Sequence, residues 1–166
     1  MRLIFLDFDG VMLNFNDIRR GARMKFSDSC VSTFNEMARI LEEKLVPPGT
    51  IAEPFGVVVS SSWRIGRSPG DMQKLFEIEG VDATVVGLTP DLPWELTTKN
   101  ARGEEIRAFM KQWKEGGLEI ESFVIIDDDI GEIIDVFPDN TVRITNRLRG
   151  FTELEANKAI EVLIDG

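Results

Sequence analysis

Three short apolar runs in this sequence each lead directly into side chains that could do chemistry. The runs and the polar residues that follow them are residues 3–6 before Asp7 and Asp9, residues 57–59 before Ser60 and Ser61, and residues 123–126 before Asp127 and Asp128. Apolar runs of this length are typical of buried strands. In an open parallel sheet, ligands bind beyond the carboxyl ends of the strands. We therefore expect these six polar residues to meet in one crevice.

Four carboxylates and a serine hydroxyl gathered at one point favour phosphoryl transfer. Such carboxylates repel one another, and a divalent cation would keep them ionised; Mg²⁺ held by a few carboxylates, waters and a substrate phosphate is the usual arrangement. One carboxylate can then attack phosphorus and form an aspartyl-phosphate. A second acid, two residues further on, can protonate the leaving oxygen and later deprotonate the attacking water. A serine hydroxyl can bind a phosphate oxygen, and a lysine or arginine can offset the developing charge.

The absence of two residue types narrows the chemistry further. The sequence has no histidine and no tyrosine. This excludes Ser-His-Asp and Cys-His nucleophiles and histidine zinc sites, so a general acid or base must be Asp, Glu, Lys or Cys. Oxygen ligands favour magnesium or calcium over zinc. Cys30 is the single cysteine, which rules out an intramolecular disulfide and fits a reducing cytoplasm.

The elements that must position these residues alternate along the chain. Strands are expected at residues 3–6, 57–59, 83–86, 123–126 and 141–144. Helices are expected at residues 29–45, 71–78, 103–114, 130–136 and 153–164, the last with a capping-box pattern at Thr152 and Glu155. Residues 90–99 are expected to form an irregular segment without a helix or a strand. Strands separated by helices predict an α/β fold with a mainly parallel sheet covered on both faces.

The motifs resemble those of the haloacid dehalogenase (HAD) superfamily. The Asp-Phe-Asp-Gly-Val segment at residues 7–11 resembles its first motif, residues 57–60 its second, and Ile-Ile-Asp-Asp at residues 125–128 its fourth. A narrower likeness, to the small HAD domains of bacterial and phage proteins, some of them fused to RNA-repair modules, is carried by residues 60–64, 102–106, 125–129, 145–146 and 150–152. The resemblance implies a three-layer, Rossmann-like HAD fold with about five strands, in one domain over residues 1–166.

Carried over by position, the resemblance implies a role for each strand-end residue. Asp7 would be the nucleophile and a metal ligand, and Asp9 the acid/base and a ligand through its backbone carbonyl. Ser60 would bind the phosphate. Asp128 would be the acid of the last pair that touches the metal, with Asp127 beside it. Because Asp9 is present, the resemblance favours phosphate over carbon–halogen or phosphonate chemistry.

The third motif and the second serine leave alternatives open. Lys99 matches the usual lysine of the superfamily, whereas Arg102 matches the narrower pattern, and we favour Arg102. Ser61 either contacts the substrate or caps the next turn. Arg64 either binds phosphate or pairs with an acid. For Trp63 we favour packing over stacking on a substrate.

The room for a cap domain limits what can cover the crevice. Residues 10–27 suffice for a hairpin-like flap but not for a separate domain, and residues 64–99 leave little room for a second fold. An open crevice would accept a nucleotide, a nucleic-acid end or a small phosphate ester, covered by the flap or by a second copy of the chain. A cluster at Arg19, Arg20 and Arg23 either lies in a solvated loop or contacts a polyanionic substrate; we favour the loop.

The overall composition is that of a folded domain with a strongly acidic surface. The chain has 166 residues, of which 43% are hydrophobic, and a formal net charge of −10. This charge argues against an extended nucleic-acid track, although a terminal phosphate needs only a small basic patch. No apolar run approaches a membrane span or a signal-peptide core, so we expect a cytoplasmic location. The alternative to a phosphomonoesterase is a catalytically idle HAD module that binds a phosphorylated partner.

Overall fold

Five short parallel strands form one sheet, in the order β3-β2-β1-β4-β5. The computed structural model describes residues 1–21, 25–93, 101–128, 131 and 133–166. The strands are β1 (Leu3–Leu6), β2 (Gly56–Val59), β3 (Val85–Leu88), β4 (Phe123–Asp127) and β5 (Thr141–Arg143). The helices are α1 (Phe15–Arg19), α2 (Asp28–Leu45), the 3-10 turn η1 (Ser62–Arg64), α3 (Pro69–Glu79), α4 (Ala101–Glu115) and α5 (Glu153–Asp165).

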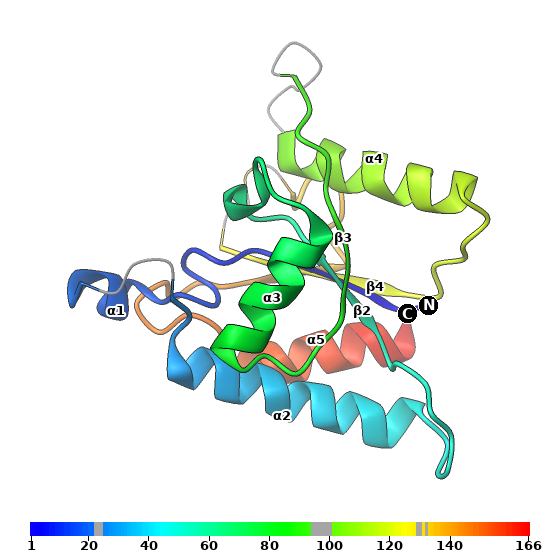
Figure 1. The fold of residues 1–166 in the computed structure, drawn as a ribbon, viewed down its shortest axis with the longest axis horizontal. Coiled ribbons are helices and arrows are strands. Elements are labelled where there is room, and N and C mark those ends of the chain that lie inside the picture. The colour runs from blue at the N-terminus through cyan, green and yellow to red at the C-terminus, as the bar shows by residue number, and fades with distance from the viewer. Residues whose placement is uncertain (22–24, 94–100, 129–130, 132) are drawn as a thin grey trace.

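The helices cover both faces of the sheet and complete three layers (Figure 1). One face packs against α2, α3 and α5, and its core includes Ile4, Leu6 and Val59 of the central strands. The other face packs against α4 and includes Leu3 and Phe5. Successive residues of a strand point to opposite faces, and both faces are covered, which explains why the central strands are continuously apolar.

The register of the sheet places three strand ends level with one another. Leu6, the last residue of β1, pairs with Val59 of β2 on one side and with Ile126 of β4 on the other. The ladder continues for one more residue, because the Asp7 N–H donates to the Ile126 carbonyl (3.1 Å) and the Ser60 N–H donates to the Leu6 carbonyl (3.0 Å). The polar residues that follow these strands therefore meet at one edge of the sheet.

The expected α/β class, the parallel sheet and most of its elements are confirmed. The capping pattern at α5 is present, since the Glu155 carboxylate accepts hydrogen bonds from the backbone N–H (3.2 Å) and the hydroxyl of Thr152. The strand expected at residues 83–86 lies two residues later. Gly87 is part of this strand. A β-carbon at residue 87 would lie 2.5 Å from the Phe109 ring, so glycine leaves the room that this ring occupies.

One other local expectation was wrong. The described residues of the segment 130–136 form turns and not a helix, and the N–H groups of Val136 and Phe137 both donate to the Ile133 carbonyl at 2.9 Å. The flap expected at residues 10–27 stays a prediction. Its described part contains the short helix α1, which Asn14 caps by accepting a hydrogen bond from the Asp17 N–H (2.9 Å).

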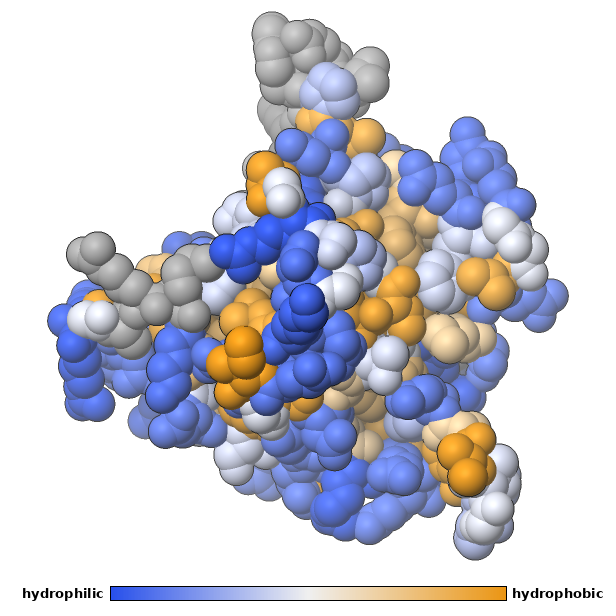
Figure 2. Space-filling model, viewed as in Figure 1, coloured by the Kyte–Doolittle hydropathy of each residue, from blue (hydrophilic) through white to orange (hydrophobic). Residues whose placement is uncertain are grey.

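The visible surface is mainly hydrophilic, and apolar residues show most clearly between α3 and α4 (Figure 2). Within the described parts of the chain, no helix is both long enough and apolar enough to cross a bilayer.

Candidate active site

Alternation along the strands aims three of the polar residues at the same face of the sheet. Phe5 lies in the core under α4, and Asp7 follows it by two residues. By the same count, Ser60 follows Val58 and Asp127 follows Ile125, both of which belong to that core. Asp7, Ser60 and Asp127 therefore lie side by side on the α4 face, at the carboxyl edge of the sheet.

Arg102, from the first turn of α4, joins two of these residues. Its Nη1 atom lies 3.0 Å from Oδ1 of Asp7 and 3.0 Å from Oδ2 of Asp127. Burial alone would lower the pKa of Arg102, but the two carboxylates outweigh it and raise the pKa. Arg102 is therefore charged at the bottom of the site. Lys99, the other candidate for the third motif, lies outside the described residues.

The acidic residues are close enough together to share one cation. One carboxylate oxygen each from Asp7, Asp127 and Asp128 lies within 4.8 Å of the other two. Asp127 is fully buried and Asp7 is 4% exposed. An all-oxygen donor set of this kind suits Mg²⁺. The predicted contact of Asp9 with the metal runs through its backbone carbonyl and stays a prediction.

Ser60 adds a hydroxyl group to the same edge. The residue is fully buried, and among the described residues its Oγ has no hydrogen-bond partner. A buried hydroxyl without a partner costs free energy of folding. In a site beside Asp7, such a group fits an incoming ligand oxygen, which is the role that the sequence predicts for Ser60.

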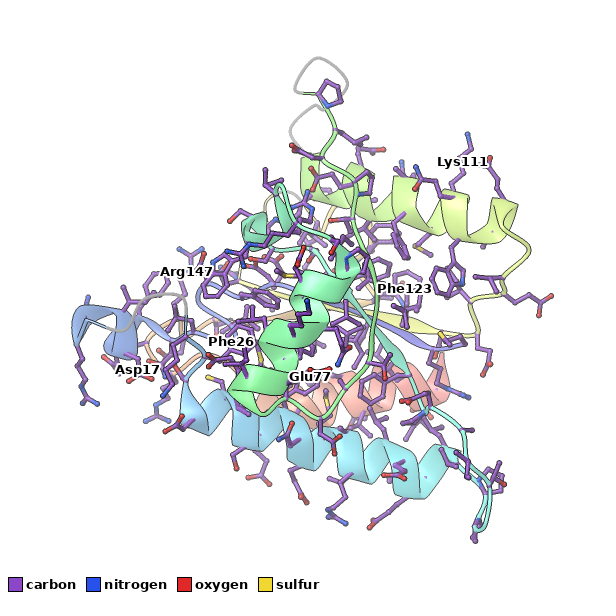
Figure 3. The ribbon with its side chains drawn as sticks, viewed as in Figure 1. Asp17, Phe26, Glu77, Lys111, Phe123 and Arg147 are labelled. Atoms are coloured by element: carbon purple, nitrogen blue, oxygen red, sulfur yellow. The ribbon has the colours of Figure 1, made fainter. Side chains whose placement is uncertain are left out.

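The side chain of Asp128 lies between the loop after β1 and a second arginine, Arg147. Its Oδ2 atom lies 2.7 Å from Nε of Arg147, whose Nη2 also donates to the Asp128 carbonyl (3.3 Å). Arg147 in turn holds the flap helix: its carbonyl accepts from the Phe15 N–H (2.8 Å), and its guanidinium lies 5.9 Å from the centre of the Phe15 ring. Figure 3 shows Arg147 on the side of the molecule where α1 lies.

The carboxylate of Asp9 has a partner that sequence reasoning missed. The indole Nε1 of Trp63 donates to Oδ2 of Asp9 at 3.0 Å. The pKa of Asp9 is raised, first by burial and then by the charge of Asp7, although the hydrogen bond from Trp63 and the charge of Arg102 act against this. A raised pKa suits a group that must donate a proton near neutral pH.

Ser61 and Arg64 take up structural positions in the turn after β2. The Ser61 hydroxyl is fully buried and accepts from the Trp63 N–H (3.4 Å), so it caps η1. The guanidinium of Arg64 is buried and donates to four carbonyls: Ser60, Ser61, Thr89 and Pro90. It also pairs with Glu105 of α4 at 2.7 Å. These contacts favour a structural role over substrate binding for both residues.

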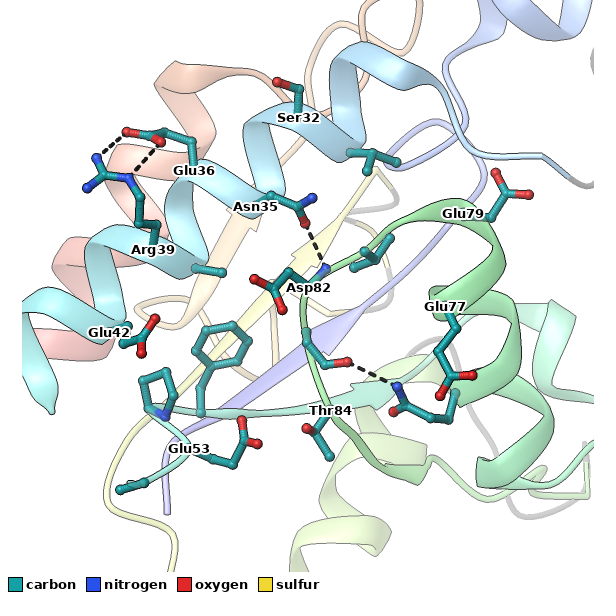
Figure 4. A pocket seen from close by; sticks show the side chains of 18 of the residues that line it. Ser32, Asn35, Glu36, Arg39, Glu42, Glu53, Glu77, Glu79, Asp82 and Thr84 are labelled. Atoms are coloured by element: carbon teal, nitrogen blue, oxygen red, sulfur yellow. Dashed lines mark hydrogen bonds and ion pairs between the residues drawn. The ribbon is translucent and has the colours of Figure 1, made fainter. Parts of the chain in front are cut away.

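A large hollow lies elsewhere, between α2 and α3 (Figure 4). It measures about 1400 Å³, and none of the strand-end residues lines it. Its lining is acidic, with the carboxylates of Glu36, Glu42, Glu53, Glu77 and Asp82 among others. Accumulated negative charge does not suit a phosphate, so this hollow is not the candidate site.

A comparison with protein families agrees with this arrangement of residues. The model of one family, the HAD domain in Swiss Army Knife RNA repair proteins, matches residues 3–156. No curated protein and no solved structure gives a match. The matched range includes β1, β2, α4 and β4 and therefore every strand end of the site. Membership of this family supports a phosphatase-like function of the general HAD type. The chain belongs to the family of HAD domains found in Swiss Army Knife RNA repair proteins.

Proposed function

We propose that this protein is a magnesium-dependent phosphomonoesterase that works through an aspartyl-phosphate on Asp7. The observation that carries the proposal is the bridge from Arg102 to Asp7 and Asp127, at 3.0 Å each, inside a cluster of three neighbouring carboxylates. Mg²⁺ bound by Asp7, Asp127 and Asp128 would offset the negative charge of the phosphate that Asp7 must approach.

The residues of the site divide the reaction between them. Arg102 holds Oδ1 of Asp7, which orients the carboxylate, and supplies positive charge to the transferring phosphoryl group. Ser60 would donate its hydroxyl, which has no hydrogen-bond partner among the described residues, to a phosphate oxygen. Asp9 would donate a proton to the leaving oxygen as the bond from phosphorus to that oxygen breaks and the bond to Asp7 forms. Asp9 would then take a proton from the water that hydrolyses the aspartyl-phosphate.

We further propose that the substrate is a terminal phosphate on a nucleic acid or a nucleotide. The family description places related domains in RNA repair proteins. The rim also suits a single phosphate group and not a long track, because Arg147 is about half exposed beside Asp128 while the whole chain carries a net charge of −10.

The proposal is tested by hydrolysis of an aryl phosphate with and without Mg²⁺, followed by a panel of nucleotides and of oligonucleotides with 3′- or 5′-phosphate ends. We expect turnover that needs Mg²⁺ and is lost in Asp7→Asn. Turnover that survives in Asp7→Asn would contradict the assigned nucleophile. Binding of a phosphorylated oligonucleotide without any turnover would instead support an idle module that binds a phosphorylated partner.

A further inference from the structure

We propose that Trp63 is a positioning residue, which holds the carboxylate of Asp9 in the orientation required for proton transfer to the leaving group. The proposal rests on the proposed phosphomonoesterase function. It starts from the 3.0 Å hydrogen bond that the indole Nε1 donates to Oδ2 of Asp9. Trp63 does not touch the reacting atoms in this role, because it acts through Asp9.

The indole is fixed by the aromatic residues around it. The ring of Trp63 meets the edge of Phe8, with ring centres 5.4 Å apart and planes at 82°, and stacks on Phe26 at 5.9 Å and 29°. Phe8 and Phe26 are buried, and both also contact Phe76 of α3. Figure 3 shows Phe26 beside α3. A ring packed on two sides is a precise hydrogen-bond donor, since its N–H direction cannot vary freely.

The backbone that carries Trp63 is fixed as well. Ser61 caps η1 by accepting from the Trp63 N–H, and the buried guanidinium of Arg64 holds the carbonyls of Ser60 and Ser61 at 3.4 and 3.0 Å. The turn from Ser60 to Arg64 thus connects two parts of the site. Its first residue brings a hydroxyl to the phosphate, and its fourth reaches back to Asp9.

The hydrogen bond determines which oxygen of Asp9 transfers the proton. Trp63 binds Oδ2, so Oδ1 is the oxygen assigned to the leaving group. In the first step the proton moves from Oδ1 to the leaving oxygen while the bond between phosphorus and that oxygen breaks. In the second step water attacks phosphorus, gives its proton back to Oδ1, and the bond to Asp7 breaks. A misdirected Asp9 would affect the first step most when the leaving group is strongly basic.

The test compares Trp63→Phe with Trp113→Phe. Trp113 is the matched control because its buried Nε1 has no hydrogen-bond partner among the described residues, and it packs on Phe109 of the same helix, α4. The measured quantity is kcat/KM, which covers the steps up to release of the leaving group, for an alkyl phosphate and for p-nitrophenyl phosphate. In Trp63→Phe we expect kcat/KM to fall by about tenfold or more for the alkyl phosphate and by less than about threefold for the aryl phosphate. In Trp113→Phe the ratio of kcat/KM for the alkyl phosphate to kcat/KM for the aryl phosphate should equal that of the wild type.

A double-mutant cycle shows whether the effect runs through Asp9. In an Asp9→Asn background, Trp63→Phe should change neither value further, because the proton donor is already lost. Equal losses for both substrates in Trp63→Phe, or losses that add to those of Asp9→Asn, would overturn the proposal while leaving the phosphatase function in place. Absence of turnover in the wild type would refute the proposed function itself.

A second variant covers the case in which Trp63→Phe does not fold. Phe26→Leu removes the stacked ring but keeps the indole N–H. We expect it to shift the ratio of the two kcat/KM values in the same direction by about threefold. An unchanged ratio in a folded Phe26→Leu protein would overturn the proposal.

Discussion

The carboxylate of Asp128 lies where a side chain at residue 10 would begin. A β-carbon built on Gly10 would lie 2.3 Å from Oδ2 of Asp128, and the φ angle of Gly10 is +77°. Residue 10 must therefore be glycine for two reasons, a left-handed backbone and a close approach by a predicted metal ligand. The second reason links the loop after β1 to the metal site directly.

Gly10→Ala should weaken metal binding as well as the fold. The new methyl group would displace Asp128, so we expect the Mg²⁺ concentration for half-maximal activity to rise by about tenfold or more. Gly49→Ala is the control, because its φ of +80° imposes the same backbone strain with nothing within 4 Å of the added β-carbon. Gly49→Ala should lose about 1 kcal/mol of stability and keep the wild-type Mg²⁺ dependence, measured by titration of activity with Mg²⁺. Equal Mg²⁺ dependence in both variants would contradict the link.

Arg102→Ala should impair both catalysis and the stability of the metal-free protein. Removing the guanidinium takes away a positive charge that lies 3.0 Å from Asp7 and 3.0 Å from the fully buried Asp127. We expect kcat/KM to fall by about 100-fold or more and the free energy of unfolding without metal to fall by about 3 kcal/mol. Added Mg²⁺ should raise the Tm of Arg102→Ala more than that of the wild type. Arg107→Ala, which removes an exposed partner of Glu104 on the same helix, should change neither quantity.

Ser60→Ala should separate stability from function. Because the Ser60 hydroxyl is buried without a described partner, its loss removes an unsatisfied group and should leave the Tm unchanged or slightly higher. The same change removes a predicted contact to the phosphate, so kcat/KM should fall by about tenfold. Thermal unfolding and steady-state kinetics on one preparation test both halves. A lower Tm together with unchanged kinetics would show that the hydroxyl is structural.

Arg64→Ala should destabilise the fold more than it affects substrate binding. The change leaves four carbonyls and Glu105 without the guanidinium that they surround, and we expect a loss of about 3 kcal/mol or more. In the fraction that folds, KM for a small phosphate ester should stay within about twofold of the wild type, because the guanidinium points into the protein. A large rise in KM without loss of stability would return Arg64 to the substrate-binding residues.

The pH dependence of kcat/KM should have its alkaline limb set by Asp9. Asp9 donates a proton in the first step, so activity is present while it is protonated and falls as pH rises through its pKa, which burial raises. The hydrogen bond from Trp63 lowers that pKa, so Trp63→Phe should move the limb to higher pH. Asp9→Asn should abolish the limb. Profiles of the three proteins for one alkyl phosphate check this order.

The strand ends were predictable from sequence because burial and chemistry coincide there. The runs before Asp7 and Asp127 are apolar on both faces, so the first charged residue marks the edge of the sheet. The position of Arg102 beside those acids required the resemblance to a family, since spacing along the chain does not show which residue of a helix faces a strand end. The strand β3 lies later than predicted because glycine usually marks the end of a strand. Gly87 instead lies within β3, where it leaves room for Phe109.

The sequence could not show that one side chain has two roles in the structure. Trp63 was expected to pack, and it does, yet its N–H is directed at Asp9 by that same packing. Arg64 left two interpretations open because one guanidinium can bind a phosphate or pair with an acid. The choice depended on where Thr89 and Glu105 lie in space.

The N-terminal end of α4 holds three arginine–carboxylate contacts at once. Arg102 reaches the site, and Glu105, three residues on, reaches Arg64. Fraying of this end of the helix would release all three together. In an α-helix the amides of residues 105–108 donate to the carbonyls of residues 101–104, so these amide hydrogens report on the competence of the site. Slower hydrogen exchange of these amides on addition of Mg²⁺ and an unreactive phosphate analogue would show that ligand binding stabilises this end of the helix.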